Sequence, residues 1–277
     1  VIPRESVAGE RRTSATPETV KKMIRLGAEV AIESGAGAAV GFDDSIYAEL
    51  GAEIVADRAA LLGSADMVLR LRKPEPDEIG MMKSGCIHVS YLDPFNERDL
   101  IKTLADKGIT AISMEMIPRS TRSQKMDALS SQANLAGYVA VMLAAAQLPR
   151  IFPMLMTPAG TLKPAKVFII GAGVAGLQAI ATAKRLGARV TAFDTRPVVA
   201  EQVQSLGGKF LEIDLGDTGQ TSDGYAKELT PEQVEIQRQA QKDVIADSDV
   251  VITTAQVFGR KPPVLVTKDM VEGLSLI

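Results

Sequence analysis

The sequence has very little of the residue types that disulfides, zinc sites and many hydrolytic active sites require. Its 277 residues include one cysteine, Cys86, and one histidine, His88. A single cysteine excludes an internal disulfide, and the two residues together cannot supply the Cys/His cluster of a zinc site. A serine–histidine–acid triad would depend on His88, which precedes Val89 on an apolar segment typical of a strand. We therefore predict no metal site, and we interpret Cys86 as a small core residue and His88 as a core or sheet-edge residue.

The sequence also has no excess of positive charge and no long hydrophobic run. The formal net charge is −3 and no basic run is present, so nucleic acid is not an expected partner. The strongly apolar stretch 135–148 includes Gln147 and is shorter than the ~20 residues that span a bilayer, so we expect the chain by itself to be soluble. No secretory leader is evident at the start. Residues 273–277 resemble a strand cut before its end, which predicts a fragment of a longer subunit.

The most informative feature that is present is an apolar segment, 167–170, followed by three spaced glycines and a helical segment. In dinucleotide-binding proteins the first glycine makes a tight turn, the second lets the pyrophosphate approach the backbone, and the third lets helix and strand pack closely. Free N–H groups at the start of the helix then face the phosphates. The residues expected to line this turn are Gly171, Ala172, Gly173, Val174 and Gly176.

An acidic residue ends the next apolar segment, 189–193, about 20 residues after the turn. This residue, Asp194, would accept hydrogen bonds from the adenosine ribose diol and repel a 2′-phosphate, so NAD(H) is the predicted ligand. Thr195 and Arg196 follow it in the same predicted site. An arginine at this place can also accommodate a 2′-phosphate, which is the alternative to our interpretation of Arg196 as a solvated loop cation.

Helical and strand patterns alternate along the whole chain, which predicts an α/β fold. Strands are expected near 29–32, 54, 67–71, 87–91 and 110–114, and later at 207–215 and 250–254. Helices are expected at 17–26, 44–50, 176–186 and 231–245, with one long helix over 127–147. We predict two doubly wound domains joined by that long helix: residues 1–129, and a Rossmann dinucleotide-binding domain over 130–277 that is truncated at its C-terminal end.

A short hairpin is predicted at 152–164, with its turn at 158–160. Its methionines and leucines cannot bury one another, because an isolated hairpin has no core of its own. Packing against a partner subunit and packing against the parent domain both remain open.

With these segments placed, the sequence resembles the NAD(H)-binding alpha subunit, or first domain, of proton-translocating nicotinamide nucleotide transhydrogenases. The resemblance covers essentially the whole chain. The segments that carry it are 4–5 with 9–12, 118–119 with 124–127, 130–138, 171–186, 224–227 and 251–255. The stretch 130–138 is specific to that family, whereas the glycine turn is shared with many unrelated enzymes.

Alanine dehydrogenases resemble the chain too, but their proton-transfer residues are replaced. Arg72 stands where they have a lysine, and Asp93 stands where they have a histidine. Arginine cannot release a proton at working pH, and an aspartate with a reference pKa of ~3.9 is a poor proton shuttle near neutrality. Arg12 matches their carboxylate-binding arginine, which we interpret as structural here. An amino-acid dehydrogenase of the alanine or saccharopine type is therefore the alternative function, and a non-catalytic NAD-sensing module is a second one.

The transhydrogenase resemblance implies an enzyme component with Re/Si specificity that passes a hydride directly from NADH to NADP⁺ on a partner domain. Such a transfer needs positioning and neither a general base nor a metal. The implied partners are an NADP(H)-binding domain, a transmembrane proton-channel domain and a second copy of the chain joined through the hairpin. The implied location is peripheral, on the cytoplasmic face of the bacterial inner membrane, or on the matrix side in mitochondria.

The resemblance also implies site residues around the nicotinamide. Arg119 would contact the pyrophosphate and carboxamide region, and Gln124 would reach toward the second nucleotide or the proximal ring. Asp127 and Ser130 would hold the carboxamide and ribose. Because Gln124, Asp127 and Ser130 are spaced by three, we expect them to share one face of a helix.

Four further residues complete the predicted nucleotide site. Tyr225, beside Gly224, resembles a mobile-loop tyrosine that folds over the bound nucleotide, with a plain surface tyrosine as the alternative. Gln237 is expected along the same cleft. Gln256 is placed at the end of the last strand, where the sequence departs from the pattern expected for the family.

Overall fold

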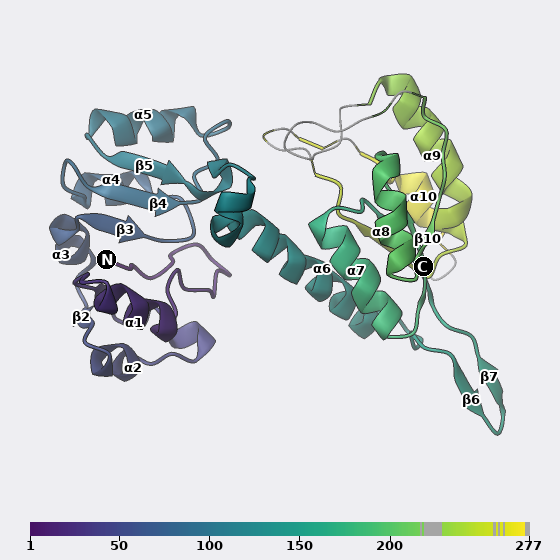
Figure 1. Cartoon of the computed structure of the whole chain (residues 1–277), viewed down its shortest axis with the longest axis horizontal. Helices are drawn as coiled ribbons and strands as arrows, with labels where there is room; N and C mark the ends of the chain where they lie inside the picture. Colours follow the sequence, from purple (N-terminus) through teal and green to yellow (C-terminus); the bar gives the residue numbers. More distant parts are fainter. Residues whose placement is uncertain (217, 219–228, 257–258, 260, 263, 275–277) are drawn as a thin grey trace. The chain divides into compact units, whose positions relative to one another are not determined.

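The structure is a computed structural model that describes residues 1–216, 218, 229–256, 259, 261–262 and 264–274. The chain divides into two compact units, Val1–Ala128 and Leu129–Ile277. Each unit is an α/β structure with its own sheets and its own core (Figure 1).

Unit 1 is built on short parallel strands. Its helices and strands, in chain order, are α1 (Pro17–Arg25), β1 (Ala31–Glu33), α2 (Asp44–Glu49), β2 (Glu53–Val55), α3 (Arg58–Ser64), β3 (Met67–Leu69), α4 (Pro76–Met81), β4 (Ile87–Ser90), α5 (Arg98–Asp106) and β5 (Thr110–Ser113). Strand β1 pairs with β2, and β4 lies between β3 and β5. The N-terminal residues connect the two groups, because Ile2 N donates to Ala31 O at 2.9 Å and Leu69 N donates to Val1 O at 3.0 Å.

The core of unit 1 contains both residues that the sequence marks as scarce. Cys86 is fully buried in the cluster that includes Leu62, Val68 and Leu104, as predicted. His88 is fully buried on β4, which confirms that it is a core residue.

Unit 2 contains a four-stranded parallel sheet in the order β10-β9-β8-β11. Its helices and strands are α6 (Ala128–Gln147), β6 (Leu155–Thr157), β7 (Gly160–Leu162), β8 (Lys166–Ile170), α7 (Val174–Arg185), β9 (Arg189–Phe193), α8 (Ala200–Ser205), β10 (Lys209–Phe210), α9 (Pro231–Ala246), β11 (Val250–Thr253) and α10 (Lys268–Glu272). Strand order reverses between β8 and β11, and ligands of open α/β sheets bind at such a switch point.

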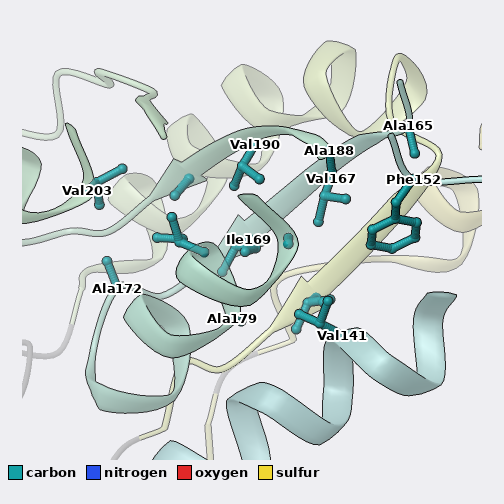
Figure 2. Close-up of a cluster of buried hydrophobic side chains, with 14 of the residues drawn as sticks. Val141, Phe152, Ala165, Val167, Ile169, Ala172, Ala179, Ala188, Val190 and Val203 are labelled. Atoms are coloured by element: carbon teal, nitrogen blue, oxygen red, sulfur yellow. The ribbon is translucent and has the colours of Figure 1, made fainter. Parts of the chain in front are cut away.

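Alternate residues of β8 face opposite sides of the sheet, and each side has its own core. Val167 and Ile169 pack with Ala179 of α7 and with Val141 of α6 (Figure 2). Phe168 and Ile170 belong to a second cluster with Ile245 of α9. Helices thus cover both faces of a parallel sheet, and the predicted α/β, doubly wound fold is confirmed.

Two predicted elements differ in extent. The strand expected over 207–215 is limited to Lys209–Phe210, and residues 211–215 lie outside it. The hairpin is confirmed, since β6 and β7 pair antiparallel and extend from unit 2 as a separate ribbon (Figure 1). Helix α6 is long and apolar enough to span a membrane, judged by its length and composition alone. This is weak evidence for a membrane span, because core helices of soluble proteins can have the same length and composition.

Candidate nucleotide-binding site

The glycine turn between β8 and α7 is crowded on one side and open on the other. Gly171 has φ +99°, and a Cβ there would lie 2.9 Å from Thr254 Oγ1. A Cβ at Gly176 would lie 1.8 Å from Gly171 O. By contrast, no atom lies within 4 Å of the place where a Cβ of Gly173 would stand. The first and third glycines therefore permit the close packing of the turn, and the middle one leaves open space beside the start of α7.

Asp194, which follows β9, is joined to this turn by a hydrogen bond. Ala172 N donates to Asp194 Oδ2 at 2.7 Å, and both residues are buried. Burial by itself would raise the pKa of Asp194, but hydrogen bonds from Arg196 and Ala172 outweigh it and hold that pKa below its ordinary value. The acid is therefore ionised at neutral pH at the carboxyl end of the sheet, beside the turn.

Arg196 is not the solvated loop cation that the sequence suggested. Its side chain is only 14% exposed and forms a salt bridge with Asp194, with Nε 2.8 Å from Oδ1. Arg196 Nη2 also donates to Oδ2 at 2.9 Å, and Arg196 N donates to Oδ1 at 2.9 Å. The prediction of a solvated cation was wrong because Asp194, only two residues away, forms a largely buried salt bridge with Arg196.

These residues fit the adenosine and pyrophosphate parts of a dinucleotide. The open side of Gly173 and the N-terminus of the 12-residue helix α7 suit an anionic pyrophosphate. The carboxylate of Asp194 suits a ribose diol, but its four acceptor positions are already taken by Ala172 N and by three N–H groups of Arg196. A diol would therefore compete with the Arg196 side chain for Asp194.

The residues predicted around the nicotinamide fall in both units. In unit 1, Arg119 Nε lies 3.6 Å from Asp127 Oδ2, so these two side chains are brought together. Gln124 lies in a 3₁₀ helix, Thr121–Met126, that ends at Asp127. Asp127 has non-helical backbone angles, φ −74° and ψ 78°, and α6 begins at the next residue with Ser130 in its first turn. The prediction that Gln124, Asp127 and Ser130 share one helix face is therefore wrong, because two separate helices meet at Asp127.

The remaining predicted residues have varied surroundings. Gln237, on α9, is 1% exposed, and its Oε1 has no hydrogen-bond partner among the described residues. Thr195 O accepts a hydrogen bond from Thr218 Oγ1 at 2.7 Å, and Gln256 is exposed beyond the end of β11. Gly224 and Tyr225 lie outside the described residues.

One residue with a clear structural role had no role assigned from the sequence. Thr254 Oγ1, just after β11, donates to Gly171 O at 2.9 Å and so holds the glycine turn from the neighbouring strand. Its position at the carboxyl end of a strand was the available signal. The bond itself joins residues 83 apart in sequence, which a local pattern does not reveal.

The residues at the positions that match functional residues of alanine dehydrogenases do not form a proton shuttle in this chain. Arg12 Nη2 and Arg72 Nε both contact Glu10 Oε2, at 2.7 and 2.9 Å. The hydrogen bond from Arg12 is the main reason that the pKa of Glu10 falls to about 2. His88 Nε2 lies 3.0 Å from Ser90 Oγ, and burial, together with the charge of Arg70, lowers the pKa of His88 to about 4. The geometry thus gives Arg12 a structural partner and keeps His88 neutral inside the core.

Asp93, where alanine dehydrogenases have their histidine, is held by its own loop. It is the one non-glycine residue with positive φ, +50°, in the described part of the chain. Its two carboxylate oxygens accept from Asn96 Nδ2 at 2.8 and 3.1 Å. A carboxylate engaged in this way shapes the loop after β4.

The fold and this site define a two-domain α/β protein with a Rossmann-type nucleotide site. The chain belongs to the alanine dehydrogenase/PNT family: residues 1–136 match its N-terminal domain and residues 140–276 match its C-terminal domain. It is 45% identical to the first part of NAD(P) transhydrogenase subunit alpha of Rhodospirillum rubrum, over 98% of this chain and 72% of that protein. It is 30% identical to alanine dehydrogenase of Bacillus subtilis, over 99% of this chain and 67% of that enzyme.

Among solved structures, a transhydrogenase from Sinorhizobium meliloti superposes with a TM-score of 0.87 at 42% identity, over 99% of this chain and 74% of that one. The resemblance predicted from the sequence is therefore confirmed at the level of the family. These relatives support the role of an oxidoreductase component of the transhydrogenase kind, with a nicotinamide dinucleotide as its ligand.

Proposed function

We propose that the chain is the NAD(H)-binding component of a proton-translocating transhydrogenase, in which hydride passes from NADH to NADP⁺ held by a partner domain. The observation that carries the proposal is the buried carboxylate of Asp194, hydrogen-bonded at 2.7 Å to the glycine turn. A negative charge at this place accepts a ribose diol and repels a 2′-phosphate, which favours NAD(H) over NADP(H). The higher identity to a transhydrogenase subunit, 45% against 30% for an alanine dehydrogenase, supports the same choice.

In the proposed mechanism, this chain binds NADH and orients its nicotinamide ring. NADH, when bound, supplies the hydride. The turn at Gly171–Gly176 and the first turn of α7 hold the pyrophosphate, and Asp194 holds the adenosine ribose. Arg119, Asp127 and Ser130 orient the nicotinamide end, Gln124 faces the second nucleotide, and Tyr225 closes over the site. Gly224, Gln237 and Gln256 are proposed to complete the nucleotide contacts. Positioning of this kind accounts for large rate effects without acid–base chemistry.

The proposed reaction requires partner domains, and we include them in the proposal. A single dinucleotide turn binds one nucleotide, so an NADP(H)-binding domain docks beside this chain, and a transmembrane domain couples transfer to proton movement. A second copy of the chain joins through the hairpin β6–β7. The assembly would be peripheral on the cytoplasmic face of a bacterial inner membrane, or on the matrix side in mitochondria.

The test is reconstitution of hydride transfer. The purified chain is mixed with a separately produced NADP(H)-binding transhydrogenase domain, and transfer from NADH to an NADP⁺ analogue is followed by absorbance. We expect rapid transfer that falls by about 10²-fold in Arg119→Ala, because misplacement of the nicotinamide by about 1 Å costs that much. Arg25→Ala, at an exposed position on α1, is the matched control and should transfer hydride like the unaltered chain.

Two results would contradict the proposal. Reductive amination of pyruvate with NADH would indicate an amino-acid dehydrogenase. Tight NADH binding without any transfer to the partner domain would indicate a nucleotide-sensing module.

A further inference from the structure

Helices α6 and α7 meet main chain to main chain at one point. Gly137, buried on α6, faces the carbonyl group of Ala175 in the first turn of α7. A Cβ at Gly137 would stand 2.1 Å from Ala175 O and 2.9 Å from Ala175 C. Contacts between an α-hydrogen and a carbonyl oxygen recur at close helix–helix interfaces. Only glycine at residue 137 allows the two helices this approach.

The first turn of α7 cannot move away to make room for a larger residue. On its other side, Gly176 is packed against Gly171 O, where a Cβ would stand 1.8 Å from the oxygen. The same carbonyl is held by Thr254 Oγ1 at 2.9 Å. Both contacts involve main-chain atoms, so trimming a side chain does not relieve them. A side chain at residue 137 would therefore displace α6.

The face of α6 that meets α7 also carries a predicted nucleotide contact. Ser130 and Gly137 are seven residues apart, which is about two helical turns, so they lie on nearly the same face and about 10 Å apart along the axis. On the other side of Gly137, Val141 continues this face into the core of unit 2 (Figure 2). A shift of α6 at Gly137 would therefore move Ser130 relative to the glycine turn.

We propose that Gly137 is a positioning residue of the nucleotide site, which sets the separation between Ser130 on α6 and the turn at Gly171–Gly176. The inference rests on the proposed function, in which the turn holds the pyrophosphate and Ser130 holds the nicotinamide end. Gly137 acts through the two main chains that it brings together. It accounts for a glycine at a buried helical position, where alanine would otherwise favour the helix.

The experiment compares two ligands in Gly137→Ala. NADH spans the turn and the nicotinamide contacts, whereas ADP-ribose has the adenosine and pyrophosphate but lacks the nicotinamide. We expect NADH affinity to fall by about tenfold and hydride transfer by up to about 10²-fold, because the nicotinamide end is misplaced. ADP-ribose affinity should change by less than about threefold, because the turn itself stays in place. Ser130→Ala should show the same selective pattern for the two ligands.

Two controls separate positioning from loss of stability. Gly80→Ala makes the same replacement in α4, where no atom lies within 4 Å of the new Cβ. Val141→Ala weakens the packing of the same helix without obstructing the contact at Gly137. Both controls should keep the wild-type ratio of NADH to ADP-ribose affinity. If Gly137→Ala does not fold, Ala140→Val, one turn along the packed face of α6, should change the ratio in the same direction by a smaller factor.

The outcomes are distinguishable from failure of the proposed function. An equal loss of affinity for both ligands, or an unchanged ratio in folded Gly137→Ala, would overturn the positioning role. If the unaltered chain binds NADH but transfers no hydride, the proposed function fails while the affinity ratio still decides the role of Gly137. If Ser130→Ala leaves NADH affinity unchanged, the assumed nicotinamide contact is itself wrong, and the inference falls with it.

Discussion

At the scale of single residues, Asp194 and Arg196 form the contact that we propose decides between NAD(H) and NADP(H). Their salt bridge places a guanidinium against the oxygen atoms of the acid. In the proposed function a ribose diol displaces part of this bridge and donates hydrogen bonds to the carboxylate, whereas a 2′-phosphate would bring a second negative charge beside it. On this proposal, the choice between NAD(H) and NADP(H) depends on one buried contact.

Removal of the acid should reverse the nucleotide preference. In Asp194→Ala the diol loses its acceptor and Arg196 is released to meet a 2′-phosphate, so NADH affinity should fall by about tenfold or more while NADPH affinity rises. Equilibrium titration with both reduced nucleotides, followed by their fluorescence, measures the two changes. The double variant Asp194→Ala/Arg196→Ala is the control, because it should lose the gain for NADPH. An unchanged preference in Asp194→Ala would show that the adenosine ribose binds elsewhere.

At the scale of secondary-structure elements, the glycine turn is held on several sides by segments far apart in sequence. Thr254 after β11 holds Gly171, Ala172 is bonded to Asp194 after β9, and α6 contacts the start of α7 through Gly137. A turn restrained in this way presents its N–H groups in a fixed geometry before the ligand arrives. Preorganisation of this kind reduces the entropy that binding would otherwise lose.

The hairpin β6–β7 carries apolar side chains that are exposed in this chain. Met156 is 83% exposed, and Met154, Leu155 and Leu162 are exposed as well. A surface of this kind marks an interaction site, and we propose that it joins two copies of the chain.

A charge on the hairpin should weaken the dimer. Met156→Glu places a carboxylate on the proposed interface, so the dissociation constant of the dimer should rise by at least about tenfold, which sedimentation velocity over a range of concentrations measures. Lys163→Glu adds a carboxylate just after β7 at an exposed polar position and should leave the dimer intact. If Met156→Glu leaves the dissociation constant of the dimer unchanged, the hairpin is not the dimer interface.

At the scale of the whole molecule, the two units bury different titratable groups. Unit 2 buries the carboxylate of Asp194 together with the neutral polar side chains of Thr182, Gln237 and Gln241. Unit 1 buries charged groups: Arg70 is paired with Glu78 at 2.6 Å, and Arg58 joins Glu78 to Glu33. His88 lies fully buried in the same unit, where burial and the charge of Arg70 disfavour its protonation. Unit 1 should therefore respond to acid before unit 2 does.

Acid should destabilise unit 1 in a pH range set by His88. With a pKa of about 4 in the folded chain against 6.5 when unfolded, His88 binds a proton more readily in the unfolded state. Its contribution to stability is complete well above pH 6.5 and is lost as the pH falls toward 4, by roughly 1–2 kcal/mol between pH 6.5 and 5. Hydrogen exchange of unit 1 peptides in urea, measured across this range, gives the free energy of opening.

The variant His88→Gln isolates this effect. It keeps a polar side chain near Ser90 but cannot titrate, so the slope of stability against pH between 6.5 and 5 should flatten. Glu10 and Glu78, whose pKa values are lowered in the folded chain, act only below about pH 4.5, the ordinary value for a glutamate. A slope that is unchanged in His88→Gln would assign the acid sensitivity to other groups.

The sequence by itself determined the features that depend on neighbouring residues. The strand, the spaced glycines and the helix of the nucleotide turn follow from local backbone requirements, and the alternation of helical and strand segments indicated a parallel sheet. The replacement of proton-transfer residues by Arg72 and Asp93 was also readable directly, because side-chain chemistry needs no structure. These features identified the fold class and the family.

Only the tertiary structure decided how separate segments meet. It showed that Arg196 closes on Asp194, that a helix break at Asp127 separates Gln124 from the face of Ser130, and that Thr254 supports Gly171. It also showed the main-chain contact of Gly137 with Ala175. Local propensity contains no information about such contacts, because they depend on which strands and helices become neighbours when the hydrophobic core closes.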